Sequence, residues 1–286
     1  MKKVILFSLG LISILFATTI NIPSDYTTIQ GGINASLDGD TVLVAQGTYA
    51  ENLILANEIV LASYAIYDDL DSEWFNNENI NNTIISGALT GSCLVIRDGN
   101  IEPTVTGFTF QDGTGTSMIV VDCDPYPVRS GGAILIYKAY PTINYNRFMD
   151  NGFSGEEGQN TANGGAISHF SDDDVEFDED RDNSSQSNNT NRDIPTTLNI
   201  QYNYFEGNSS GDGENFYAHG YDGDIDVSGS VFENIDCESN SVNKFVLRSL
   251  EDEADYIQNE ISGLCIESNS FYVSIIGDDN NDGTET

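Results

Sequence analysis

Short apolar runs separated by turn-forming residues dominate the chain. Val, Leu and Ile cluster in residues 41–45, 53–55 and 59–62, and Gly, Asn and Asp stand between the clusters. Runs of this length predict short buried strands, because helices need longer periodic segments. Gly47-Thr48-Tyr49, between two of the runs, predicts a turn. Strands this close together, without intervening helices, suit a parallel coil in which each strand pairs with its counterpart one turn later.

One pattern recurs five times: an aliphatic residue, four residues, then a phenylalanine. Such repetition indicates a solenoid, with the phenylalanines stacked in its interior. Two residues before the phenylalanine stand Asn146, Asn203 and Asn269, which predict a ladder of side-chain amides. Asparagine also tolerates the left-handed backbone of a sharp corner, so the corner is expected at these residues. The five copies are Val105–Phe110, Ile143–Phe148, Ile200–Phe205, Val227–Phe232 and Ile266–Phe271.

The N-terminal region predicts a short capping helix before the first strand. Thr27 or Thr28 can cap it, and Ile29, Ile33 and Leu37 would share its apolar face. Gly39 is placed to end it.

The same region carries the resemblance to a known fold. Residues 22–30 (IPSDYTTIQ), 38–44 (DGDTVLV) and 47–52 (GTYAEN) resemble the beginning of the pectin-lyase-like superfamily, and residues 83–87 and 105–110 resemble its later segments. The resemblance covers most of residues 20–275. It implies an all-β right-handed parallel β-helix (solenoid) with a short N-terminal capping helix. The superfamily holds lyases, hydrolases, epimerases and non-enzymatic surface proteins, so activity does not follow from it.

A second resemblance points to surface proteins. Residues 131–134 and 164–167 are both Gly-Gly-Ala-Ile, and each precedes a Phe-x-x-Asn segment, at 148–151 and 205–208. The pattern resembles the repeats of polymorphic outer-membrane proteins, which are β-helical adhesins. The same residues also serve coil geometry, with glycine in tight turns and phenylalanine in the core.

Two segments interrupt the rhythm. Residues 64–82 contain the single tryptophan, Trp74, and predict a loop leaving the first coils. Residues 171–193 form an acidic insertion, read either as a solvated loop or as a loop ordered by calcium. Solenoids accept insertions on one face, often the binding face.

The chain begins like an exported protein. Lys2 and Lys3 precede an apolar run at 4–16 and small residues at 17–19, so residues 1–19 predict a signal peptide; a membrane anchor is the alternative. No later segment is long and apolar enough to span a membrane. We expect secretion, or location at a bacterial cell surface or outer membrane. The net charge of −36 argues against nucleic acid as a partner, because phosphate binding needs clustered Lys and Arg.

The chain has four cysteines, and the sequence does not determine whether they form disulfides. The separations of Cys93 from Cys123 and of Cys237 from Cys265 each match about one coil. These separations are compatible with disulfides between adjacent coils and also with buried free thiols.

Catalytic motifs of the superfamily are missing, so we lean against an enzyme. The Gly-His-Gly of polygalacturonase-type hydrolases is reduced to Ala218-His219-Gly220, and their Arg-Ile-Lys segment is absent. His169 and His219 lack a third partner for zinc. No available basic residue lies in a recognisable lyase motif; these are Arg97, Arg129, Lys138, Arg147 and Lys244.

The C-terminal segment offers a candidate calcium site. Asp278, Asn280 and Asp282 precede Gly283, as at the start of a D-x-N-x-D-G calcium loop; a plain Asx-rich turn is the alternative. Residues 276–286 also predict the start of a further module or a linker, in a chain that continues beyond Thr286.

These features favour an exported surface protein that binds a polysaccharide or another cell-surface ligand. Two alternatives stay open. One is a polysaccharide lyase or glycoside hydrolase, which the fold readily hosts. The other is a structural spacer in a longer protein.

Overall fold

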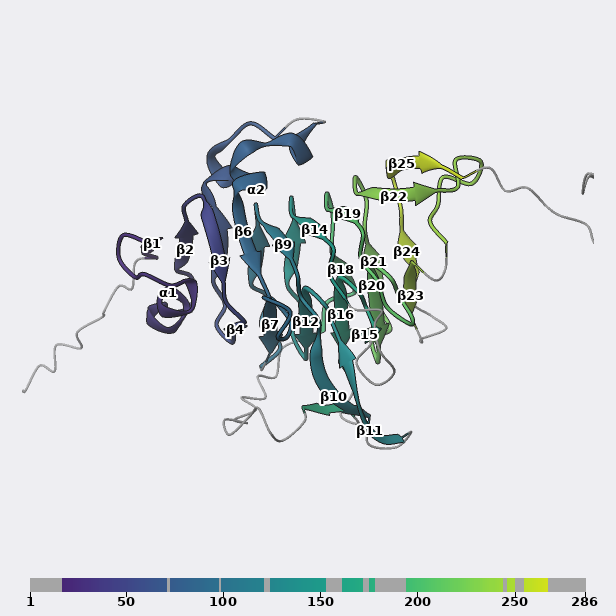
Figure 1. The fold of residues 1–286 in the computed structure, drawn as a ribbon, viewed down its shortest axis with the longest axis horizontal. Helices are drawn as coiled ribbons and strands as arrows, with labels where there is room; N and C mark the ends of the chain where they lie inside the picture. Colours follow the sequence, from purple (N-terminus) through teal and green to yellow (C-terminus); the bar gives the residue numbers. More distant parts are fainter. Residues whose placement is uncertain are drawn as a thin grey trace, which may run out of the picture.

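The computed structural model describes residues 17–70, 73–97, 99–120, 124–152, 161–171, 175–177, 194–243, 246–249 and 255–266. The chain winds through successive coils, and a typical coil adds one strand to each of three parallel sheets (Figure 1). Neighbouring strands in these sheets come from consecutive coils. The predicted all-β parallel solenoid with a short N-terminal helix is therefore confirmed.

Sheet A contains the strand that opens each of the early coils. Its line is continued by a second, three-stranded sheet, whose first strand contacts the last strand of sheet A. Sheet A consists of β1 (Thr19–Ile22), β2 (Thr41–Val44), β5 (Val60–Ser63), β8 (Thr104–Thr106) and β13 (Thr142–Asn144); its continuation consists of β18 (Thr197–Asn199), β21 (Asp224–Asp226) and β24 (Tyr256–Ile257).

Sheet B contains the second strand of each coil. It consists of β3 (Gly47–Ala50), β6 (Thr83–Ser86), β9 (Thr109–Gln111), β14 (Arg147–Met149), β19 (Tyr204–Glu206), β22 (Val231–Ile235) and β25 (Ser262–Cys265). The expected turn at 47–49 is wrong, because these residues pair in register with β6 as strand β3. Pairing with a neighbouring coil overrides the local turn preference of Gly47.

The phenylalanine column predicted from the repeats lies on the inner side of sheet B. Phe110, Phe148, Phe205 and Phe232 pair in register on consecutive strands. Their rings stack with centroids 5.4, 5.1 and 5.2 Å apart and nearly parallel planes. Each buried ring removes apolar surface worth about 1.5–3 kcal/mol from water.

Sheet C contains the third strand of each coil and is covered on its outer side. It consists of β4 (Leu53–Leu55), β7 (Leu94–Arg97), β12 (Ile134–Tyr137), β16 (Ile167–Phe170), β20 (Phe216–His219) and β23 (Leu247–Ser249). A small side sheet, sheet D, joins β15 (Thr161–Asn163), β11 (Asp124–Ser130), β10 (Thr116–Val120) and β17 (Val175–Phe177). Met118 of this sheet packs with Leu135, Phe170 and Tyr217 in a second apolar cluster. Strand β17 belongs to the predicted acidic insertion, of which residues 172–174 and 178–193 lie outside the described residues.

The two Gly-Gly-Ala-Ile segments stack directly on one another. Ile134 pairs with Ile167, and the N–H of Gly132 donates to the carbonyl of Gly164 at 3.0 Å. A Cβ added to Gly132 would collide with the carbonyl oxygen of Gly165. Coil packing therefore requires this glycine.

The N-terminal helix α1 (Ile29–Ala35) begins as predicted and ends earlier. The Oγ1 of Thr28 accepts a hydrogen bond from the N–H of Gly31 at 3.1 Å, and Ile29 and Ile33 are buried. The helix ends at Ala35, with Ser36 as its C-cap, rather than near Gly39. Leu37, expected on the apolar face, lies past this end and is 59% exposed.

The predicted loop at 64–82 contains three helical segments. They are η1 (Tyr64–Tyr67), η2 (Trp74–Asn76) and α2 (Glu78–Asn82), and residues 71 and 72 lie outside the described residues. Trp74, Ala65 and Ile80 form a buried cluster against the coils.

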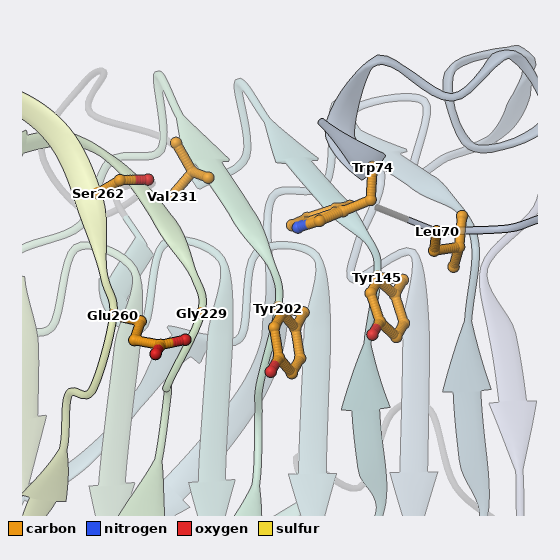
Figure 2. Close-up of a pocket in the computed structure, with 8 residues that line it drawn as sticks. All are labelled: Leu70, Trp74, Tyr145, Tyr202, Gly229, Val231, Glu260 and Ser262. Carbon is orange, nitrogen blue, oxygen red and sulfur yellow. The ribbon is translucent and has the colours of Figure 1, made fainter. Parts of the chain in front are cut away.

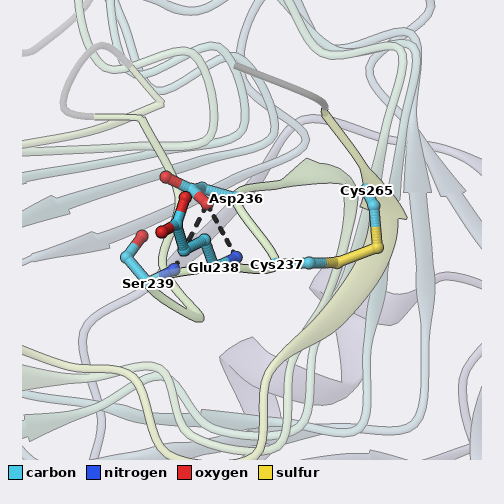
Figure 3. The surroundings of a disulfide bond; sticks show 5 residues. All are labelled: Asp236, Cys237, Glu238, Ser239 and Cys265. Atoms are coloured by element: carbon cyan, nitrogen blue, oxygen red, sulfur yellow. Dashed lines mark hydrogen bonds between the residues drawn. A yellow bond between two sulfur atoms is a disulfide. The ribbon is translucent and has the colours of Figure 1, made fainter. Parts of the chain in front are cut away.

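The described part of the fifth repeat does not continue the phenylalanine column as predicted. Strand β25 places Gly263 opposite Phe232, and Ile266 beyond it is 52% exposed. Phe271 lies outside the described residues. A disulfide between Cys237 and Cys265 instead joins this last coil to the turn after β22, beside Asp236 (Figure 3). One of the two open cysteine pairings is thereby present, while Cys93 is a buried free thiol and Cys123 lies outside the described residues.

Candidate functional site

One corner of the solenoid holds its backbone in the left-handed region on five consecutive coils. The five residues precede sheet B and have positive φ angles of 85, 53, 53, 68 and 54°; they are Gly107, Tyr145, Tyr202, Gly229 and Glu260. Glycine adopts this conformation freely, whereas bulky side chains rarely do. Tyr145 and Tyr202 therefore occupy a strained position that costs roughly 1–2 kcal/mol each. Strained side chains cluster at functional sites, which directs attention to this corner.

The predicted asparagine ladder holds the corner at Asn146 and Asn203, while Asn269 lies outside the described residues. The Oδ1 of Asn203 accepts hydrogen bonds from the backbone N–H of Asn146 at 3.1 Å and from its Nδ2 at 3.4 Å. The N–H of Phe108 donates to Asn146 Oδ1 at 3.0 Å, and the N–H of Asn203 donates to Ser230 Oγ at 3.1 Å. The sequence prediction erred by one residue: the asparagines are the buried ladder, and the left-handed residues are the tyrosines before them.

A second asparagine ladder, in the Phe-x-x-Asn segments, holds the next corner. The N–H of Asn151 donates to Asn208 Oδ1 at 3.1 Å, and Asn208 Nδ2 donates to Asn215 Oδ1 at 3.1 Å. Here too the preceding residues, Asp150 and Gly207, have positive φ. Buried amides thus hold the strands of sheet B at both of their ends.

The strained tyrosines form an aromatic row along the solenoid axis. The rings of Tyr145 and Tyr202 stack with centroids 5.2 Å apart and planes 11° apart. Trp74 meets Tyr145 edge-on, with centroids 5.6 Å apart. On its other side Tyr202 lies against Gly229, since a Cβ at Gly229 would collide with the tyrosine ring.

The loop at 64–82 positions Trp74 through its own hydrogen bonds. Asn77 caps α2 by accepting from the N–H groups of Asn79 and Ile80 at 2.8 and 3.1 Å. The side-chain amides of Asn77 and Asn79 both donate to Asp68 Oδ2, at 2.9 and 2.7 Å. These hydrogen bonds hold the pKa of Asp68 below its usual value. These contacts order the helical segments around Trp74, whose side chain is only 4% exposed.

The loop is also attached to sheet B. Arg147 Nη1 donates to Asn81 Oδ1 at 2.5 Å, and its guanidinium lies 5.0 Å from the ring centroid of Tyr204. Phe75 stacks on the same Tyr204 ring at 5.7 Å.

A groove of about 410 Å³ runs beside the aromatic row (Figure 2). Its lining is aromatic and apolar on one side and polar on the other. In Figure 2 the carboxylate of Glu260 points toward Gly229 and Tyr202, across a floor that carries no side chain at Gly229. The lining residues are Leu70, Trp74, Tyr145, Tyr202, Gly229, Val231, Glu260 and Ser262. A groove of this size, with few polar groups among aromatic ones, is typical of small-ligand sites.

The tyrosine hydroxyls in this row are available for hydrogen bonding. Burial, and then the neighbouring Tyr202, raise the pKa of Tyr145 above its usual value. Its hydroxyl therefore stays protonated at neutral pH and can both donate and accept.

A second, smaller pocket of about 170 Å³ lies further along sheet B and is lined by carboxylates. Glu206, Glu214 and Glu233 line it together with buried Asn208 and Asn215. Loss of hydration, and then the charge of Glu233, raise the pKa of Glu214. The outer side of sheet B is thus acidic beside the aromatic groove.

The sequence-predicted calcium ligands are at the C-terminal end of the sequence. Asp278, Asn280 and Asp282 are outside the described residues, so calcium binding stays a prediction. Among the residues that the structure describes, no group of three or more His, Cys, Asp or Glu side chains could hold a metal ion.

The two histidines form no catalytic arrangement with each other. His169 is buried in the core with its Nε2 3.1 Å from the carbonyl of Ala139. The ring of His219 lies 6.1 Å from Phe170, its partner on the neighbouring strand.

Basic residues named as lyase candidates contact rings or carbonyls. Arg97 lies over Phe177, Lys138 over Tyr137, and Arg129 donates to the carbonyl of Gly115 at 3.1 Å. Lys244 is outside the described residues.

Sequence reasoning missed Tyr145 and Tyr202. The available signal was their place in two consecutive repeats, immediately before the ladder asparagines. Steric restrictions favour glycine at this backbone position. A tyrosine that recurs there is therefore retained for its side chain and not for the backbone geometry.

Comparison with known protein families, curated proteins and solved structures gives no match at all. The geometry therefore defines the class by fold alone: a parallel β-solenoid with an aromatic groove along one corner. In the part of the chain that the structure describes, no helix has the length and apolar character needed to cross a membrane.

Proposed function

We propose that this protein is an exported β-solenoid that binds carbohydrate in the groove beside Trp74, Tyr145 and Tyr202. The observation that carries the proposal is the pair of stacked tyrosines held at strained backbone positions on consecutive coils. Glycine fills the same position on the coils at either side, so the backbone conformation itself does not require tyrosine. A retained cost of this kind is expected where side chains serve recognition.

The chemistry of the groove suits a sugar. Sugar rings have an apolar face of C–H groups and a rim of hydroxyls. Tyr202, which is 36% exposed, offers an aromatic surface, and Glu260 and Ser262 offer hydrogen-bonding groups on the other side. Binding modules commonly combine rigid aromatic anchors with a few polar contacts.

The N-terminal leader and the acidic surface support an exported location. The paired asparagine ladders and three parallel sheets support membership of the pectin-lyase-like superfamily. Both remain parts of the proposal.

The test is a glycan array followed by calorimetry on the full chain, comparing wild type with Tyr202→Gly. Glycine is compatible with the left-handed backbone, so the variant keeps the corner and removes the aromatic side chain. We expect wild type to bind one class of oligosaccharide and the variant to lose about five- to thirtyfold in affinity, since losing a stacked sugar costs on the order of 1–2 kcal/mol. Equal affinity of wild type and Tyr202→Gly for the sugar would show that the groove is not the binding site.

Glycoside hydrolysis is the second candidate. The observation that favours it is the grouping of Glu214, Glu206 and Glu233 in one pocket, where loss of hydration raises the pKa of Glu214, since glycoside hydrolysis uses two neighbouring carboxyl groups. Release of reducing ends from a bound polysaccharide, abolished in Glu214→Gln, would establish it. Tight binding without cleavage would leave the binding function alone.

A further inference from the structure

The aromatic groove and the acidic pocket share strand β22. Val231 lines the groove, and Glu233, two residues further along the same strand, lines the acidic pocket. Phe232 between them is buried and both flanking residues are more exposed, so Val231 and Glu233 lie on the outer side of the strand, with a β-bulge just beyond Phe232. Glu206 follows Phe205, which pairs with Phe232, so Glu206 and Glu233 lie on the outer side of adjacent strands. With Glu260 in the groove itself, three carboxylates lie along one path.

The charge on this path is only partly offset. The cation described there, Arg147, is already held against Tyr204 and Asn81. Tyr204 itself donates to Glu206 Oε2 at 2.8 Å. The groove therefore presents negative potential to a ligand, in a chain whose net charge is −36.

Gly229 shapes the space between the aromatic and acidic sides. Tyr145 and Tyr202 stack on each other, and the next position of the column carries no side chain. Coils in a parallel sheet are about 4.8 Å apart, so Tyr202 and Glu260 start about two coil spacings apart across Gly229. A pyranose ring beside Tyr202 would extend the aromatic row and bring its substituents to Glu260.

We propose that the groove selects oligosaccharides that carry free amino groups, with Tyr202 contacting the sugar ring and Glu260 pairing with its ammonium. Glu233 and Glu206 extend the same recognition to neighbouring sugars. This inference rests on the proposed carbohydrate-binding function and specifies its ligand. Polyanionic chains such as polygalacturonate are repelled by the same carboxylates, and N-acetylated sugars lack the charge.

The experiment uses the full chain and three probes: a glucosamine tetrasaccharide, its fully N-acetylated counterpart and a galacturonate tetrasaccharide. Affinities are measured by calorimetry at pH 6.0 at low and at near-physiological salt. The variants are Glu260→Gln, which removes the charge with little change in shape, and Glu238→Gln, an exposed glutamate in the turn beside the disulfide, as the matched control.

We expect the glucosamine probe to bind at least about tenfold tighter than the N-acetylated one and to weaken as salt rises. Glu260→Gln should lose that preference, while Glu238→Gln keeps it. Equal affinity for both sugars, or no effect of Glu260→Gln, would overturn the inference and leave the carbohydrate function standing. Preference for galacturonate would overturn it as well. Failure of all three probes, together with a silent glycan array, would count against the proposed function itself.

Discussion

Asn146 and Asn203 lie one above the other in consecutive coils, and the Oδ1 of Asn203 accepts both the backbone N–H and the side-chain amide of Asn146. Asn203 also donates through Nδ2 to the carbonyl of Ile143 at 2.8 Å. Both asparagines are fully buried. One side chain thus satisfies several polar groups of the preceding coil that water does not reach.

Asn203→Leu should destabilise the fold by about 2–4 kcal/mol. The substitution leaves the N–H of Asn146 and the carbonyl of Ile143 buried without these partners, and each orphaned group costs about 1–3 kcal/mol. Urea unfolding followed by circular dichroism measures the change. Asn199→Leu, at an exposed position of β18, is the control and should shift stability by less than about 0.5 kcal/mol. Similar losses in both variants would deny the ladder its structural role.

Tyr202→Gly should leave stability nearly unchanged although it removes a large aromatic side chain. Relief of the left-handed backbone returns roughly 1–2 kcal/mol, and loss of stacking on Tyr145 costs about 0.5–1.5 kcal/mol. The measurement is the thermal midpoint of the variant beside that of Tyr202→Ala. Alanine loses the stacking and keeps the strain, so it should be the less stable of the two. The reverse order would show that the backbone at Tyr202 is unstrained.

The coil architecture was predictable because it depends on local spacing. The separation from Val105 to Phe110 recurs in the next coils whatever the length of the intervening loops, so the inner column of sheet B and the asparagine ladder could be read directly. The fifth copy does not continue the column in the described residues, since the last described coil places Gly263 beside Phe232; Phe271 lies outside the described residues.

The aromatic groove could not be predicted from the spacing of residues in the sequence. Trp74 reaches Tyr145 only through the hydrogen bonds of the loop at 64–82, and Glu260 joins Tyr202 only because the coils stack. Residue preference alone predicts asparagine at the left-handed position, because asparagine tolerates that backbone conformation. The chain uses asparagine for buried hydrogen bonds and accepts strain at the exposed tyrosine instead.

The Cys237–Cys265 disulfide should stabilise mainly the last described coils. It closes a segment with a sequence separation of 28 residues, for which loop entropy predicts about 3–4 kcal/mol. Because contacts in a solenoid are between neighbouring coils, the effect should be local. In a Cys123→Ser background, replacing both cysteines by serine should speed hydrogen exchange in residues 224–265 and leave the first coils unchanged. Uniform destabilisation of all coils would contradict this.

Cys93 should behave differently from the disulfide cysteines. Burial raises the pKa of its thiol to about 12, so almost no thiolate exists at neutral pH. In the same Cys123→Ser background, the native protein should react with a thiol reagent only after denaturation. Rapid labelling of the native state would place Cys93 at the surface.

His169 should make the fold lose stability between pH 6.5 and pH 4. Its ring is fully buried between Tyr140 and Tyr221, with centroids 5.5 and 5.2 Å away. Nε2 carries the hydrogen, because it faces the carbonyl of Ala139, and Nδ1 has no hydrogen-bond partner among the described residues. Burial lowers the pKa of His169 from 6.5 to about 4 in the folded state.

Below pH 6.5 the unfolded chain therefore binds a proton at His169 that the folded chain does not, and folding stability falls as pH falls. The loss is complete near pH 4 and amounts to about 3 kcal/mol, at about 1.4 kcal/mol for each unit of difference. Asp40 and Asp236, whose pKa values are held below 3.8 by hydrogen bonds, lose their contributions only at lower pH, so the two windows separate. Urea unfolding at pH 7, 5.5 and 4 measures the slope. His169→Leu should flatten it across this window, and an unchanged slope in that variant would assign the acid sensitivity to other groups.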